Sequence, residues 1–175
     1  SANSLMASIL DKRGRASEAA DFLRNQYRNS PQGMVHYANL LVRAGRTAEA
    51  ITVISEIAEL YPDSPEVMAK LGTLMLSTGD QAGGIARLEA ALELDADYYY
   101  ADSVLALNHL RNEEFSKALE AAERIKASYQ KLSLPYGISG RAYVAMDEND
   151  KALREFKTGC ELTPGDTDTC ISYGA

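Results

Sequence analysis

Small residues recur along this chain in two registers. The first register holds Ala7, Ala38, Gly72, Ala106 and Gly140. The second register holds Ala19, Ala50, Gly84, Ala118 and Ala152. Both registers step by 31 residues once and then by 34 residues three times. A fixed period of this size is typical of a repeat array, in which each unit buries its core against its neighbours. Such an array presents a long continuous surface, so the period favours binding over catalysis.

The apolar spacing within each period is helical. In the second unit Tyr37, Ala38 and Leu41 lie on one helical face, and Ala50, Ile54 and Ile57 lie on another. A break separates the two runs in every unit, at Gly14-Arg15, Gly45-Arg46, Gly79-Asp80, Asn112-Glu113 and Glu148-Asn149. Pro31, Pro62 and Pro164 follow the second run in three units. Each unit is therefore predicted to be a helical hairpin.

This pattern resembles the tetratricopeptide repeat. The shared features are a small residue at place eight, a Gly or polar residue near fifteen, Ala at twenty and a large apolar residue at twenty-four, here Leu23, Ile54, Leu88 and Phe156. Ala122 departs from it in the fourth unit, and the first-to-second spacing is three residues short. The resemblance implies an all-α, right-handed superhelical solenoid forming one domain over 1–175. Its repeats are expected at about 2–30, 32–62, 65–96, 98–130 and 133–164, with a partial sixth at 165–175.

The same resemblance implies a binding surface. In this family the first helix of each hairpin lines a concave groove, which binds a peptide, loop or helix of another protein. The corresponding candidates here are Asn39, Arg43, Thr73, Tyr100, Ser103, Leu107, Arg111 and Arg141. Two alternatives stay open for the arginines, because guanidinium groups bind acidic or C-terminal carboxylates of a partner but also pair with nearby Asp or Glu. Two also stay open for Tyr100, since the Tyr98–Tyr100 run fits either a packed hairpin corner or an anchor for a ligand.

One known groove chemistry is not supported. Chaperone-binding members of the family carry Lys at place five and Asn at place nine of one repeat. Asn39 is present here, but Val35 stands where the Lys is expected, and Lys70 falls at place six. The sequence therefore gives no reason to expect a chaperone tail as the partner.

Two cysteines lie ten residues apart, at Cys160 and Cys170. Two free thiols are the simpler interpretation, and a disulfide is the alternative, which requires an oxidising compartment and Cα atoms within about 7 Å. No further Cys or His lies close enough in sequence to complete a metal site. His36 and His109 lack a neighbouring nucleophile, so we expect no catalytic residues, metal or cofactor.

The balance of 18 basic and 25 acidic residues gives a net charge of −7. That charge argues against nucleic acid as a partner, and no apolar run is long enough to cross a bilayer. The chain starts at Ser1 and ends within a repeat pattern. We therefore expect a fragment of a longer protein, with some self-association through its C-terminal end.

The stretch from Ala118 to Pro164 is similar to bacterial envelope repeat proteins, with "KALEAAERIKASYQKL" and "YGISGRAYVAMDENDKALREFKTGCELTP". The resemblance is to those that accompany exopolysaccharide export and PEP-CTERM sorting, and it implies a periplasmic or outer-membrane-associated segment. Two other functions stay open. The chain could be the substrate-recruiting arm of a multidomain enzyme such as a glycosyltransferase, or a cytoplasmic adaptor or assembly factor for pili or secretion.

Overall fold

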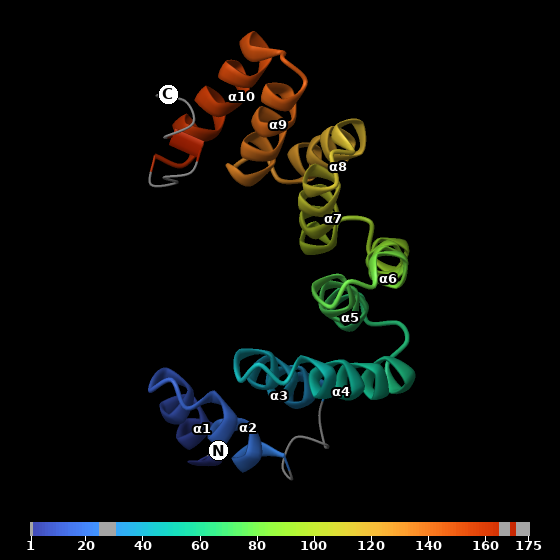
Figure 1. Ribbon diagram of the computed structural model, residues 1–175, viewed down its shortest axis with the longest axis vertical. Helices are drawn as coiled ribbons and strands as arrows, with labels where there is room; N and C mark the ends of the chain where they lie inside the picture. Colours follow the sequence, from blue (N-terminus) through green and yellow to red (C-terminus); the bar gives the residue numbers. More distant parts are fainter. Residues whose placement is uncertain (1, 25–30, 165–168, 171–175) are drawn as a thin grey trace. The chain divides into compact units, whose positions relative to one another are not determined.

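The computed structural model describes residues 2–24, 31–164 and 169–170, and these form ten α-helices with no strand among them. The helices pair in chain order as antiparallel hairpins (Figure 1). Their bounds are α1 Ala2–Lys12, α2 Ala16–Leu23, α3 Pro31–Arg43, α4 Thr47–Leu60, α5 Pro65–Ser77, α6 Gln81–Leu94, α7 Tyr99–Arg111, α8 Phe115–Ser128, α9 Leu134–Ala145 and α10 Asn149–Leu162. The predicted all-α repeat fold is confirmed.

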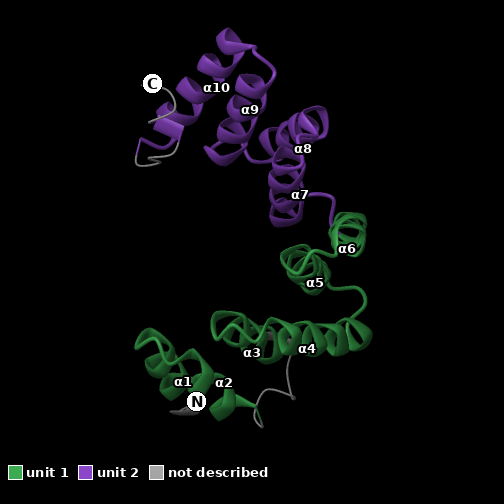
Figure 2. Ribbon diagram, viewed as in Figure 1, with its two compact units in different colours: residues 1–94 green, residues 95–175 purple. Residues whose placement is uncertain are grey.

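The chain divides into two compact units, residues 1–94 and 95–175 (Figure 2). The boundary falls between the predicted third and fourth repeats. The first unit holds the hairpins α1–α2, α3–α4 and α5–α6, and the second holds α7–α8 and α9–α10. The single domain over 1–175 stays a prediction. The partial sixth repeat lies mostly outside the described residues, which include only Thr169 and Cys170 of it, both helical.

The two registers of small residues include sites of very close approach between paired helices. All ten of these residues are buried. A Cβ atom added to Gly72 on α5 would lie 2.7 Å from the carbonyl oxygen of Gly84 on α6. One added to Gly140 on α9 would lie 2.4 Å from the Phe156 ring on α10. Both distances are too short for a real contact, so these crossings require glycine.

The Gly83-Gly84 pair combines two different situations. A Cβ on Gly84 would meet the Leu76 side chain at 2.6 Å and the Gly72 carbonyl oxygen at 2.9 Å, so backbone lies against it. The three heavy atoms nearest to a Cβ on Gly83 would all belong to the side chains of Asp80 and Met75. The predicted close packing at Gly84 agrees with this geometry, whereas Gly83 faces groups that can move.

The departure at Ala122 is compensated by the neighbouring hairpin. Ala122 occupies the place where other repeats carry a large apolar side chain. It belongs to a buried cluster with Ala106, Ala118, Ala121 and Ile138. Ile138 comes from α9 and is almost fully buried. The volume lost on α8 is therefore supplied from the next hairpin.

Each turn between paired helices contains one residue in the left-handed backbone region. Gly14, Gly45 and Gly79 occupy it in the first three hairpins, with φ of 74°, 75° and 93°. Glu113 and Asp147 occupy it in the last two, with φ of 61° and 64°. Glycine adopts this conformation readily, so the first three turns follow directly from the sequence. The fifth left-handed residue precedes the predicted break at Glu148-Asn149.

Ion pairs join elements within the second unit. The Arg124 guanidinium on α8 donates to Asp102 Oδ1 on α7 at 2.7 Å, and the Asp102 side chain is buried. Lys126 Nζ on α8 donates to Glu155 Oε2 on α10 at 2.7 Å and lies 4.8 Å from the centre of the Tyr136 ring. These contacts hold α8 against both α7 and α10.

The close crossing can be tested with a matched pair of glycine variants. Gly72→Ala is expected to destabilise the protein by about 1–3 kcal/mol, because its Cβ would collide with backbone. Gly83→Ala adds the same methyl group at a site where the nearest atoms belong to side chains. Its free energy of unfolding is expected to stay within about 1 kcal/mol of the wild-type value. Urea unfolding measures both. A Gly72→Ala protein as stable as the wild type would contradict the proposed crossing.

Candidate binding surface

The first helices of the second unit expose a mixed apolar and cationic surface. Helices α7 and α9 contact each other. On α7, the Leu107 side chain is 40% exposed and Arg111 lies one helical turn further on. On α9, Val144 is 50% exposed and Arg141 lies one turn before it. Residues at places nine, twelve and thirteen share a helical face. We name Leu107, Arg111, Arg141 and Val144 the first-helix surface.

Both arginines of the first-helix surface keep binding capacity. Arg111 Nη2 donates one hydrogen bond of 2.9 Å to Asn108 Oδ1, a neutral amide. Arg141 makes no hydrogen bond or ion pair with another described residue, and it lines a shallow hollow with Val144, Ala145 and Phe156. An exposed guanidinium beside apolar side chains can bind a carboxylate while the apolar groups bind a neighbouring side chain.

The candidates in the first unit are mostly satisfied within the protein. Arg43 Nη1 on α3 donates to Asp11 Oδ2 on α1 at 2.5 Å. Thr73 Oγ1 donates to the carbonyl oxygen of Ala69 at 2.8 Å, inside its own helix. Asn39 is half-buried. Of the two alternatives left open for the arginines, Arg43 therefore follows internal pairing.

Two candidates of the second unit make contacts within the protein. Ser103 is buried, and its hydroxyl donates to the carbonyl oxygen of Tyr99 at 2.7 Å. The Tyr100 ring lies edge-on to Tyr98, with centroids 6.3 Å apart. Tyr99 packs against Tyr129, with centroids 5.4 Å apart. The tyrosine run thus forms a packed corner between the start of α7 and the end of α8.

Comparison with known proteins supports the same repeat. A family model described as tetratricopeptide repeat matches residues 31–74. MamA from Desulfovibrio magneticus RS-1, in the structure of its segment from residue 41 to the end, has a TM-score of 0.76 at 20% identity, over 94% of each chain. Residues 31–74 thus match a tetratricopeptide repeat, and the described chain has the fold of tetratricopeptide-repeat proteins. Proteins of this kind are generally noncatalytic scaffolds for protein–protein interaction.

Two further relatives extend the comparison. YrrB, described as a tetratricopeptide-repeat protein with an unusual peptide-binding site, has a TM-score of 0.72 at 14% identity, over 97% of this chain and 89% of that one. Anaphase-promoting complex subunit 3 from Schizosaccharomyces pombe is 22% identical over 160 residues, covering 90% of this chain and 24% of that protein. The chain thus spans about a quarter of the length of the curated relative it matches.

The two cysteines form a disulfide, which is the second of the two alternatives for this pair. Cys160 on α10 and Cys170 form a disulfide with Cα atoms 4.8 Å apart, so the interpretation as two free thiols is wrong for this structure. Neighbouring Thr169 is buried. A Cβ added to Gly159 would lie 2.7 Å from Thr169 Cγ2, and one added to Gly137 would lie 3.1 Å from its Oγ1. Gly137 on α9 and Gly159 on α10 therefore leave room for the Thr169 side chain.

The two histidines lie in different surroundings. His36 is exposed. His109 Nδ1 lies 2.6 Å from Glu114 Oε2, and Lys117 Nζ donates to Glu114 Oε1 at 2.7 Å. Among the described residues, no group of three His, Cys, Asp or Glu side chains could hold a metal ion. No described helix is both long and apolar enough to cross a bilayer.

The Glu114 contacts predict a pH effect on stability. Lys117 and then His109 hold the pKa of Glu114 below its ordinary value of 4.5. A lowered carboxyl pKa stabilises the fold at neutral pH, and this contribution is lost as the pH falls below 4.5 through the lowered pKa. Glu114→Gln is therefore expected to be less stable than the wild type at pH 7 and to converge with it in acid.

Urea unfolding from pH 7 down to pH 3 measures this difference. Glu113→Gln, a change of the same type at the adjacent exposed residue, serves as the control. A stability gap for Glu114→Gln that stays constant over the whole range would contradict the assignment.

Proposed function

We propose that this protein is a noncatalytic scaffold whose first-helix surface binds a segment of a partner protein. The observation that carries the proposal is the contrast between the two units. Arg43 in the first unit is paired with Asp11, whereas Arg141 in the second unit has no partner among the described residues and adjoins exposed Val144. YrrB, which has an unusual peptide-binding site, lends support by analogy of fold.

The chemistry of the surface defines the kind of segment. Leu107 and Val144 suit apolar side chains, because their burial on binding removes apolar area from water. Arg111 and Arg141 suit an acidic side chain or a C-terminal carboxylate. The proposed ligand is therefore a segment that combines apolar residues with a carboxylate. The apolar side chains of the surface supply affinity, and the arginines fix the orientation of the ligand.

Binding can be tested with matched leucine variants. Leu107→Asp is expected to weaken binding of a captured partner about tenfold, because it places a charge at the centre of the surface. Leu153→Asp is the control, since Leu153 is 51% exposed on α10, a second helix. Arg111→Glu should also weaken binding and should reduce its dependence on salt. Isothermal titration measures the affinities. Equal losses for Leu107→Asp and Leu153→Asp would contradict the surface assignment.

We also propose that the protein works in the bacterial envelope, in polysaccharide export or protein sorting. Two observations support this: the similarity of the Ala118–Pro164 stretch to envelope repeat proteins, and the disulfide between Cys160 and Cys170. Disulfides persist in oxidising compartments such as the periplasm and are rare in the cytosol. Self-association through the C-terminal end stays a prediction, which light scattering at high concentration tests.

The envelope proposal predicts the redox state of the cysteines in native material. Freshly isolated protein is expected to take up no thiol reagent until it is reduced, because both sulfurs are joined. Cys160→Ser provides the control, since it leaves Cys170 free to react. Mass spectrometry counts the added labels. Immediate labelling of both cysteines in unreduced wild-type protein would contradict an oxidising location.

A further inference from the structure

The first unit contains a pocket that is separate from the first-helix surface. It lies between α2, α3 and α4 and has a volume of about 210 Å³. Buried Met34 and Tyr37 come from α3, and Val53 comes from α4. The remaining lining residues are Arg24, Glu49, Thr52 and Glu56. The pocket thus combines an apolar floor with charged groups.

The pocket lies near the irregular step in the spacing of the repeats. Ala19 and Ala50 are 31 residues apart, whereas the corresponding residues of later repeats are 34 apart. The pocket is lined by Arg24, which directly follows α2, and by the hairpin α3–α4, so it lies at this shortened junction. The pocket therefore lies where the repeat period is irregular.

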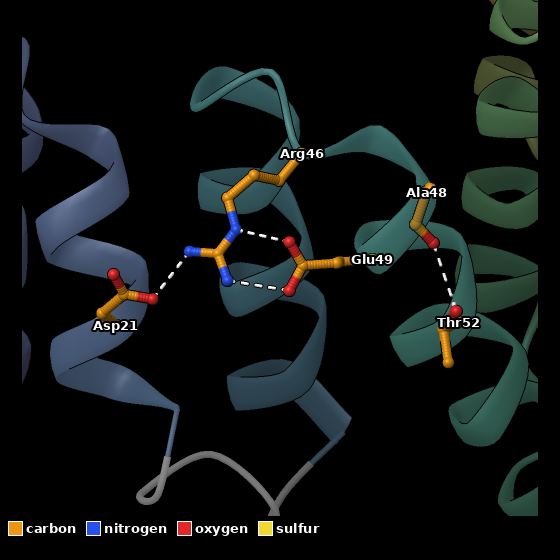
Figure 3. Close-up of polar contacts among 5 residues, drawn as sticks. All are labelled: Asp21, Arg46, Ala48, Glu49 and Thr52. Carbon is orange, nitrogen blue, oxygen red and sulfur yellow. Dashed lines mark hydrogen bonds and ion pairs between the residues drawn. The ribbon is translucent and has the colours of Figure 1, made fainter.

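Part of the charge near the pocket is already neutralised. The Arg46 guanidinium donates to Glu49 through two bonds, Nε to Oε1 at 2.6 Å and Nη2 to Oε2 at 2.8 Å. Its third nitrogen, Nη1, donates to Asp21 Oδ1 on α2 at 2.7 Å (Figure 3). The hydrogen bonds from Arg46 to Glu49, with smaller effects of the Arg46 and Arg24 charges, lower the pKa of Glu49. Glu49 is therefore committed to Arg46.

Glu56 is placed differently. It lies seven residues after Glu49 on α4, which is two helical turns or about 10 Å along the axis. In the described part of the chain it makes no hydrogen bond or ion pair. The Glu56 end of the pocket consequently carries a carboxylate that has no ion-pair partner among the described residues, beside the apolar floor.

We propose that this pocket binds the side chain of an arginine or lysine from a partner protein. The aliphatic stem would lie on Met34, Tyr37 and Val53, and the cationic head would reach Glu56. Basic side chains bury their stems on apolar surface while their charge stays near water. The net charge of −7 attracts a cationic ligand. An anionic side chain would instead meet Glu49 and Glu56. The pocket is a second contact point, independent of the first-helix surface.

The test uses N-acetyl-arginine amide as the probe and methyl-selective NMR as the measurement. Saturable shifts are expected at the Met34 and Val53 methyl groups. N-acetyl-norleucine amide, which has a similar stem without charge, should bind more weakly. Glu56→Gln should weaken binding of the arginine amide about threefold, the size expected for an exposed ion pair. Glu59→Gln, an exposed residue of the same helix outside the pocket lining, should leave binding unchanged.

Three results would overturn the proposal. They are the absence of saturable shifts with the arginine amide, equal binding of the norleucine amide, and equal affinity of Glu56→Gln and the wild type. The methyl spectrum of each variant without probe shows whether the fold is retained. Because the probe reports on the first unit and Leu107→Asp on the second, failure of one proposal leaves the other unaffected.

Discussion

The close crossing of the two helices in each hairpin is the contact on which the rest of this structure depends. At Gly72 and Gly84 the helices approach until a single added methyl group would collide with backbone. Such an approach lets Leu88, at place twenty-four, become fully buried beside the crossing. Interior packing at this density leaves little room for adjustment. The small residues therefore fix how the hairpin pairs, and the pairing decides which helix faces stay exposed.

The exposed faces then differ in how far their polar groups are satisfied internally. In the first unit, Arg43 is held by Asp11 and Thr73 by its own helix. In the second unit, Arg141 has no partner among the described residues, and Leu107 and Val144 remain exposed. An arginine already paired with a carboxylate must give up that contact to bind another. The same repeat frame therefore leaves side chains exposed and unpaired in the second unit, whereas Arg43 and Thr73 of the first unit bond within the protein.

Local sequence signals predicted the helices, turns and crossings well, because those depend on residues close in sequence or on a fixed period. Gly14, Gly45 and Gly79 marked their turns, and Gly84 its crossing. The hydrogen-bond and ion-pair partners of individual side chains could not be predicted in this way. Arg43 and Asp11 are 32 residues apart. The repeat register predicts on which helix face a residue lies, but it does not predict with which residue it pairs.

Other features needed the three-dimensional packing. The three-residue shortening before the second hairpin was visible in sequence, but the pocket at that junction depends on how Met34, Tyr37 and Val53 pack. The choice between free thiols and a disulfide depended on the distance between Cys160 and Cys170. A separation of ten residues in sequence does not determine that distance, because a segment of this length can follow more than one path.

Hydrogen–deuterium exchange with and without a bound partner tests the central claim most directly. The claim is that the crossings leave the first helices of the second unit as the binding surface. Partner binding is expected to slow exchange in the peptides covering α7 and α9, around Leu107 and Arg141, with little change in α8 and α10. Protection confined to α8 and α10, with α7 and α9 unchanged, would contradict the account.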